Sequence, residues 1–179
     1  MEYVDVLDEK GKKTGQTKPR SAVHRDGDWH GGADVWLLNS KGELLLQLRS
    51  KTKLAFPNYW DISAAGHAVA GDDSITTALK ETREELGITL SPEQLELIGQ
   101  MRMQTILNNG NFINNEFNDI YLARVDITEF HLEENGEVQE VQWVPWQTLQ
   151  KWVKEQKPDL VPHPEEYRLL FKKLESLNL

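Results

Sequence analysis

Residues 74–86 carry a pattern typical of one amphipathic helix with two neighbouring faces. At about 100° per residue, one face collects the residues expected to be buried, which are Ile75, Ala78, Leu79, Thr82 and Leu86. Three carboxylates, Glu81, Glu84 and Glu85, share the adjacent face because their positions are three and four residues apart. A chain that folds around this helix must therefore place crowded negative charges beside its core.

The crowded carboxylates predict a binding site for a hard divalent cation. A charge run on a helix is ordinarily a solvated face, and spacing alone leaves that interpretation open. However, these glutamates lie next to the apolar stripe rather than opposite to it, and carboxylates placed in this way raise one another's pKa. Because Mg²⁺ prefers oxygen ligands and bridges carboxylates to substrate phosphates, we predict Mg²⁺, with Mn²⁺ as the alternative ion, on Glu81, Glu84 and Glu85.

Three glycines frame the predicted helix. Gly66 precedes it by a loop, Gly71 can supply a positive φ within that loop, and Gly87 stands where a left-handed helix C-cap is expected. The predicted order is a strand, a tight loop, a carboxylate helix and a sharp stop.

The composition limits the partners and the chemistry. With 29 acidic and 20 basic residues, the formal net charge is −9, which disfavours binding to nucleic acid or to an anionic membrane. A site for a small phosphorylated molecule then needs a metal ion or a few local basic residues. The absence of cysteine excludes thiolate nucleophiles, disulfides and cysteine-ligated zinc. Since we find neither a leader-like start nor a membrane-length apolar run, we expect a cytoplasmic protein.

The periodicity predicts an α/β sandwich with a mixed sheet, in one domain over residues 1–179. We expect an N-terminal hairpin and arm in 1–30 and two helices in 146–179, near 146–156 and 164–177. A further short helix is expected around 18–26. The runs 33–39 and 43–49 flank a turn and predict a central hairpin. The other predicted strands are 2–7, 61–65, 95–107, 116–125 and 138–144.

The stretch 66–88 (GHAVAGDDSITTALKETREELGI) resembles the Nudix box, whose pattern is Gly, five residues, Glu, seven residues, Arg-Glu, apolar, any, Glu-Glu, any, Gly, apolar. The positions that agree in type are Gly66, Glu81, Glu84, Glu85, Gly87 and Ile88. Asp72, Lys80 and Thr82 depart mildly, and the resemblance implies that Asp72 and Lys80 pair to brace the loop. It also implies the Nudix α/β/α sandwich and metal-dependent hydrolysis of a diphosphate linkage in a nucleoside diphosphate derivative or a related metabolite.

The rest of the chain resembles the Nudix branch that contains type I isopentenyl-diphosphate isomerase and its hydrolase-like relatives. The resemblance runs through Val6–Gly11, His24, His30, Phe56–Trp60, Gly66-His67, Asn115-Glu116 and Ala123-Arg124. The isomerase uses a cysteine where this chain has Ala65, and a Glu-x-Glu pair where it has Asn114 and Glu116. We therefore expect hydrolase chemistry on an isomerase-like layout, with a residual isomerase and a non-catalytic nucleotide-binding domain as alternatives.

The resemblance assigns further roles to individual residues. The backbone carbonyl of Ala65 would be an additional metal ligand, and Arg49 and Lys53 would bind the diphosphate. Glu116 or Glu137 could act as general base, although for each the interpretation as an ordinary surface glutamate is favoured over that role.

Matching histidines hold a metal in the isomerase, at positions His24, His30 and His67. With Asn114 unable to bind as an anion, we expect that site to be lost here, and His67 to be a loop residue near the substrate. The sequence does not specify the substrate or the oligomeric state.

Overall fold

The computed structural model describes residues 2–133 and 136–177, and within them it confirms the predicted α/β fold with a mixed sheet. Met1 and residues 178–179, the ends of the two predicted terminal segments, lie outside the described residues. The strands are β1 Tyr3–Leu7, β2 Lys13–Pro19, β3 Trp29–Leu38, β4 Glu43–Arg49, β5 Trp60–Asp61, β6 Ala64–His67, β7 Glu96–Leu107, β8 Phe112–Arg124 and β9 Val138–Pro145. The helices are α1 Arg20–Asp26, α2 Ser74–Leu86, α3 Trp146–Lys154 and α4 Pro164–Glu175, with short 3-10 turns at Pro92–Gln94 and Asn108–Gly110.

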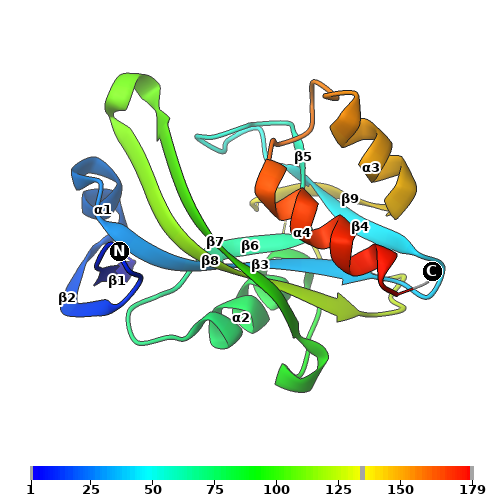
Figure 1. The fold of residues 1–179 in the computed structure, drawn as a ribbon, viewed down its shortest axis with the longest axis horizontal. Helices are drawn as coiled ribbons and strands as arrows, with labels where there is room; N and C mark the ends of the chain where they lie inside the picture. The colour runs from blue at the N-terminus through cyan, green and yellow to red at the C-terminus, as the bar shows by residue number, and fades with distance from the viewer. Residues whose placement is uncertain (1, 134–135, 178–179) are drawn as a thin grey trace.

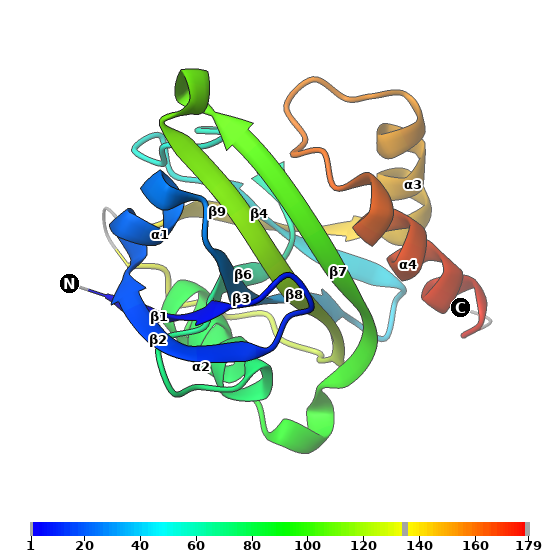
Figure 2. The same cartoon turned by 60° about the vertical axis from the view of Figure 1, so that its left-hand side comes forward.

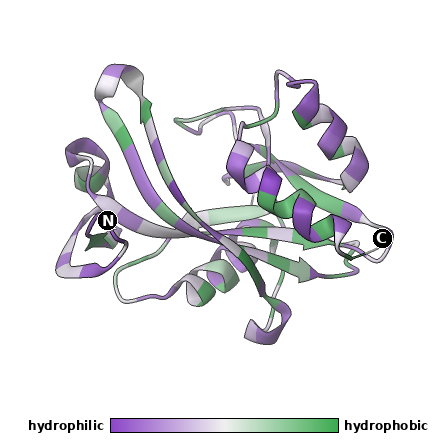
Figure 3. Ribbon diagram, in the orientation of Figure 1, coloured by the Kyte–Doolittle hydropathy of each residue, from purple (hydrophilic) through white to green (hydrophobic). Residues whose placement is uncertain are grey.

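Helices cover both faces of the sheet (Figure 1). Because successive side chains of a strand point to opposite faces, β3 contributes to two apolar cores. Trp36 and Leu38 pack with Leu170 and Leu174 of α4 on one face. On the other face, residues such as Val35 and Leu37 pack with Ala78 and Leu86 of α2. The central strands are accordingly the apolar part of the fold, as the hydropathy colouring shows (Figure 3).

The predicted hairpin of 33–39 and 43–49 is confirmed at its turn, but the two strands do not stay paired along their length. β3 and β4 pair at Leu38 and Leu44, beside the turn, and then diverge. β3 continues with β6 on one side and β8, in parallel, on the other, whereas β4 pairs with β5 and β9. Longer-range pairing overrides the local turn signal and opens a gap between the two strands.

The predicted strand 61–65 is divided into two short strands by the same divergence. β5 pairs with β4, and β6 pairs with β3. The buried Ser63 lies between them, where its hydroxyl donates to the Leu45 carbonyl at 2.6 Å and accepts the Leu37 N–H at 2.9 Å. One side chain thus ties the two halves of the sheet together at the start of the gap.

The long β7–β8 hairpin projects from the body of the protein, as Figures 1 and 2 show. β8 begins at Phe112, earlier than the predicted 116, because Asn109 and Gly110 complete the turn with positive φ angles of 56° and 88°. β8 also runs beside β3 from the Trp29–Asn115 pair onward. This pairing explains why β3 begins four residues before the predicted position.

Candidate active site

The helix predicted over 74–86 is α2, Ser74–Leu86, and it ends at Gly87 as the sequence predicts. The Asp73 side chain accepts the Thr76 N–H at 2.8 Å, which caps the N-terminus. Gly87 adopts φ 70° at the C-terminus, and Gly71 adopts φ 94° in the preceding loop. The brace also forms, since Lys80 Nζ lies 2.6 Å from Asp72 Oδ2.

The buried face of α2 is rotated toward the glutamates relative to the predicted stripe. Ile75 is 38% exposed, so its predicted burial is wrong, and Thr77 is buried instead. Ser74 in the first turn hydrogen-bonds to Asp119 and Tyr121 of β8, which sets how the helix lies against the sheet. As a result, Glu85 is buried together with Ala78 and Leu86.

Glu85 occupies the gap between the diverging strands. Its Oε2 accepts the Ala65 N–H of β6 at 3.1 Å and the Gln47 side-chain amide of β4 at 3.0 Å. Burial raises the pKa of Glu85 to about 7, against the opposing charge of Lys53. The divergence of β3 and β4 therefore creates the position in which α2 presents a carboxylate.

Glu81 packs against Gly66, and a Cβ at that glycine would overlap the Glu81 carboxylate. Burial, followed by the charges of Glu85 and Glu84, raises the pKa of Glu81 to about 8. Glu84 itself is exposed. The invariant spacing of the Nudix box thus has a local explanation here, because the small residue leaves room for the first carboxylate.

These glutamates fit a divalent cation by chemistry and by charge. Their hard oxygens suit Mg²⁺ or Mn²⁺. Burial raises the pKa of both Glu81 and Glu85, and the charges of Glu85 and Glu84 raise the pKa of Glu81 further, so a bound cation would stabilise the ionised carboxylates. The glutamate oxygens do not form a compact ligand set. In the described parts of the chain, the group of ligand atoms that all lie within 4.8 Å of one another is formed by histidines. The Ala65 carbonyl remains a predicted ligand.

The two predicted diphosphate-binding cations both have partners within the fold. Lys53 is paired with Glu137, and its charge also acts on Glu85. The Arg49 guanidinium lies 2.7 Å from Asp61 Oδ2 and donates twice to the Ala55 carbonyl. Lys53 therefore lies beside the carboxylate helix, whereas Arg49 is built into the base of the loop that carries Lys53.

Arg20, the first residue of α1, is a cation that the sequence analysis did not single out. It lies 3.0 Å from Glu2 and is partly exposed. Its charge acts on Glu137 and on the histidines of α1 and β3, so Arg20 is near enough to influence both groups. A lone arginine in an arm without periodicity gives no pattern by which it could have been found.

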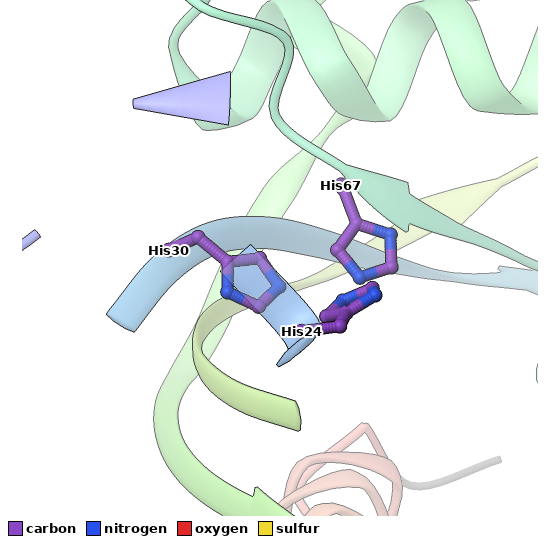
Figure 4. Close-up of side chains that lie close together, drawn as sticks. All are labelled: His24, His30 and His67. Carbon is purple, nitrogen blue, oxygen red and sulfur yellow. The ribbon is translucent and has the colours of Figure 1, made fainter. Parts of the chain in front are cut away.

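Three histidines meet on the face of the sheet shown in Figure 4. His24 comes from α1, His30 from β3 and His67 from β6, and their ring centroids are 4.9–5.1 Å apart. The predicted loop position of His67 is wrong, because β6 extends to His67 through its pairing with Gly32. Burial foremost lowers the pKa of both His24 and His30 to about 4, so both are neutral at pH 7 and available as ligands.

Glu116 lies against this histidine group. Its Oε1 is 2.9 Å from His67 Nε2 and 3.6 Å from His30 Nε2, and Asn114 donates to its Oε2 at 2.6 Å. Although burial favours the neutral acid, the neighbouring histidines and Asn114 hold the pKa of Glu116 at about 2. Glu116 is therefore an ionised, weakly basic carboxylate, and Asn114 orients it even though Asn114 cannot add a second charge.

The fold and this arrangement define a class: an α/β protein that presents a carboxylate helix and nearby cations to a metal ion and a phosphorylated ligand. The model of the NUDIX domain matches residues 28–164, and the chain belongs to the Nudix family. Its resemblance to the isomerase-like branch is confirmed by relatives named both hydrolases and isomerases.

Two relatives and one solved structure illustrate this placement. Nudix hydrolase 3 of Arabidopsis thaliana is 42% identical over 95% of this chain, which spans 23% of that protein's length. Isopentenyl-diphosphate Delta-isomerase of Cutibacterium acnes is 30% identical over 95% of this chain and 87% of its own. A crystal structure from Deinococcus radiodurans aligns with a TM-score of 0.71 at 19% identity, over 94% of this chain and 97% of the other. The last likeness supports the fold.

Within residues 2–133 and 136–177, no helix is both long and apolar enough to cross a membrane.

Proposed function

We propose that this protein is a Mg²⁺- or Mn²⁺-dependent hydrolase of a diphosphate bond in a small phosphorylated metabolite. The observation that carries the proposal is a pair of neighbouring carboxylates with raised pKa values, the partly buried Glu81 and the buried Glu85, of which Glu85 lies in the sheet gap within reach of the charge of Lys53. A bound divalent ion would supply charge neutralisation at the phosphoryl oxygens and a lower pKa for water. The named cofactors and the substrate class rest on this chemistry and on family membership.

The protein's own residues divide the remaining work. Glu81, Glu84 and Glu85 hold the cation, and Lys53 binds phosphate oxygens by charge-assisted hydrogen bonds. Lys53 is paired with Glu137 in the ligand-free protein, so phosphate binding to Lys53 would release Glu137 to accept a proton from the attacking water. This arrangement favours Glu137 over Glu116 as general base, because Glu116 has a pKa of about 2 and lies among the histidines.

The isomerase alternative is disfavoured by the side chain at position 65. Alanine cannot transfer a proton, so Glu116 alone would have to donate and accept protons on both faces of the substrate. The binding-domain alternative is disfavoured by the raised pKa values of Glu81 and Glu85, since buried acids that hold no cation are a cost to stability.

The proposed function is tested by measuring phosphate and pyrophosphate release from a panel of diphosphates with Mg²⁺ or Mn²⁺. The panel contains nucleoside diphosphates, nucleotide sugars, dinucleotides, and isoprenoid and thiamine diphosphates. Metal-dependent release by the native protein supports the proposal. If magnesium binds and a broad panel is left intact, the protein is a binding domain.

Arg20→Met is expected to raise KM about five- to tenfold with kcat within about twofold, as for loss of one ground-state phosphate contact. The charge of Arg20 acts on Glu137 and on His24, so we expect it also to attract the phosphate of a ligand bound near them. Steady-state kinetics checks this. Arg25→Met is the matched control, because Arg25 belongs to the same helix but pairs with Asp26 at the surface. An equal rise in KM in both variants contradicts the role of Arg20.

The histidine group supports a second cation site in addition to the carboxylate site, contrary to the loss expected from Asn114. His24, His30 and His67 offer neutral imidazole ligands within 4.8 Å of one another, and Glu116 adds an anion. His24 Nε2 and His67 Nδ1 are buried without a hydrogen-bond partner among the described residues. Imidazole with one carboxylate suits Mn²⁺, Zn²⁺ or a similar transition metal rather than Mg²⁺.

His67→Asn should bind one transition-metal ion per chain fewer than the native protein in equilibrium dialysis with Mn²⁺ or Zn²⁺. The exposed His131→Asn is the control, and its stoichiometry should equal that of the native protein. Equal stoichiometry in the native protein and His67→Asn would show that this group is a packed histidine cluster.

A further inference from the structure

A chain of charged contacts, centred on the buried Asp61 with the partly buried Arg49 and His163 on either side, joins the start of α4 to the loop that carries Lys53. Asp61, on the two-residue strand β5, is buried and accepts on both oxygens. His163 Nε2 lies 2.7 Å from Asp61 Oδ1, and Arg49 Nη1 lies 2.7 Å from Asp61 Oδ2. His163 is the residue directly before α4. Because isolated buried charges are costly and paired ones are held rigidly, the three side chains form one unit.

The far end of this unit fixes the middle of the 50–59 loop. Nε and Nη2 of Arg49 donate to the Ala55 carbonyl at 3.2 and 3.1 Å. The base of the loop is tied separately, since Asn58 N–H donates to the Arg49 carbonyl and Ser50 N–H to the Glu137 carbonyl. The grip on Ala55 therefore acts on the part of the loop that lies two residues from Lys53.

The loop needs these hydrogen bonds to the Ala55 carbonyl because its backbone is strained. Phe56 and Asn58 adopt φ angles of 50° and 60°. Residues other than glycine rarely adopt such positive φ angles, and the conformation persists only when surrounding contacts enforce it. The segment that carries His163 is itself fastened to β5: Trp60 N–H donates to the Asp159 carbonyl at 2.8 Å, and Val161 N–H to the Trp60 carbonyl at 2.9 Å. The start of α4 is thus a fixed support for the loop.

We propose that His163 is a positioning residue that acts through Asp61, Arg49 and Ala55 to hold Lys53 at the diphosphate site. The role rests on the proposed function of Lys53. Asp61 lies at the centre of this chain of contacts. Through it, the C-terminal region sets the geometry of ligand binding, although it is remote from the carboxylate helix in sequence.

The test compares His163→Leu, His163→Gln and Tyr167→Phe. Leucine removes the contact with Asp61, whereas glutamine can keep an N–H donor near the Nε2 position. Tyr167 is the control, because it lies on α4 one turn after His163 and is buried, and its hydroxyl donates to the Val161 carbonyl at 2.7 Å rather than to Asp61. Its ring packs edge-on against His163 at 5.9 Å between centroids, and phenylalanine keeps that ring. Thermal unfolding of all three establishes which variants are folded at the assay temperature.

His163→Leu is expected to raise KM about tenfold with kcat within about threefold, and to speed amide hydrogen exchange across residues 51–57. His163→Gln should restore most of both properties, and Tyr167→Phe should change neither. Lys53→Met and His163→Leu should also be non-additive in KM, because both act on one contact. A drop in stability with unchanged KM and unchanged loop exchange would overturn the proposal and leave His163 as a structural residue.

The exchange measurement separates this proposal from the proposed function. If the native protein hydrolyses none of the panel, loop exchange and calorimetric binding of inorganic pyrophosphate with Mg²⁺ are compared in the same variants. Faster loop exchange with about tenfold weaker pyrophosphate binding in His163→Leu supports the positioning role without any catalysis. Equal values in His163→Leu and Tyr167→Phe overturn it.

Discussion

Glu85→Gln is expected to lower kcat/KM by about 10³-fold or more while the fold is retained. Glutamine has the shape of glutamate and can still accept the Ala65 N–H and face Gln47, the two contacts that hold Glu85 in the sheet gap. It lacks the charge that a divalent ion requires. The loss should therefore be a loss of metal-dependent catalysis, and saturating Mg²⁺ should restore little of it.

The matched control for Glu85→Gln is Glu155→Gln, an identical change at an exposed position just after α3. Its kcat/KM should equal that of the native protein. Circular dichroism and thermal unfolding check that both variants are folded. Retention of more than about a tenth of the native activity in Glu85→Gln would show that Glu85 is not an essential metal ligand, and it would count against the hydrolase mechanism.

The features that were predicted correctly are those fixed by residues close in sequence. The bounds of α2 follow from its apolar period and from Gly87 at the C-cap. The Asp72–Lys80 brace follows from the spacing of the Nudix box. Each of these depends on contacts within one or two helical turns, so the sequence pattern contains the information that specifies them.

The features that were missed depend on which distant strands pair. The turn at 39–42 predicts a hairpin, but β4 pairs along its length with β9, nearly a hundred residues later. That choice opens the gap for Glu85, divides 61–65 into two strands and makes His67 part of a strand. The Asp61–His163 contact joins residues 102 positions apart, and no periodicity in either segment predicts it. At these positions, the pairing of strands distant in sequence overrides the local secondary-structure propensity.

The metal-free protein is expected to lose stability as the pH rises from 6.5 to 8.5. The pKa of Glu81 is about 8 in the folded protein against an ordinary 4.5, and that of Glu85 is about 7. Groups with a raised folded pKa contribute stability that is fully present below the ordinary pKa and is lost as the pH rises through the folded one. Most of this loss for Glu81 therefore falls between about pH 4.5 and 8.

Other titrating groups determine where the effect of Glu81 can be measured. His163, whose pKa is raised to about 9 by Asp61 against the effect of burial, contributes in the same direction above pH 6.5. His24 and His30, with pKa values of about 4, lose their contribution as the pH falls below their ordinary 6.5 and do not titrate above it. Burial also raises the pKa of Asp34 and of Glu166, so their loss of stability with rising pH has the same sign. The window from 6.5 to 8.5 therefore contains Glu85 and His163 besides Glu81, and a variant is needed to separate Glu81 from the other groups.

Glu81→Gln should reduce the fall in unfolding free energy across this window by about 2 kcal/mol, the value of the roughly 1.5 pKa units of Glu81 that lie within it. Saturating Mg²⁺ should reduce the fall in the native protein in the same way, because the ion stabilises the ionised carboxylates of the folded state. Glu81→Gln should be nearly insensitive to Mg²⁺. Urea unfolding at the two pH values, with EDTA or with Mg²⁺, measures all four cases. The same pH slope in native protein and Glu81→Gln, unaffected by Mg²⁺, would mean that Glu81 is neither crowded by its neighbours nor a ligand, and the carboxylate helix would then be a structural element.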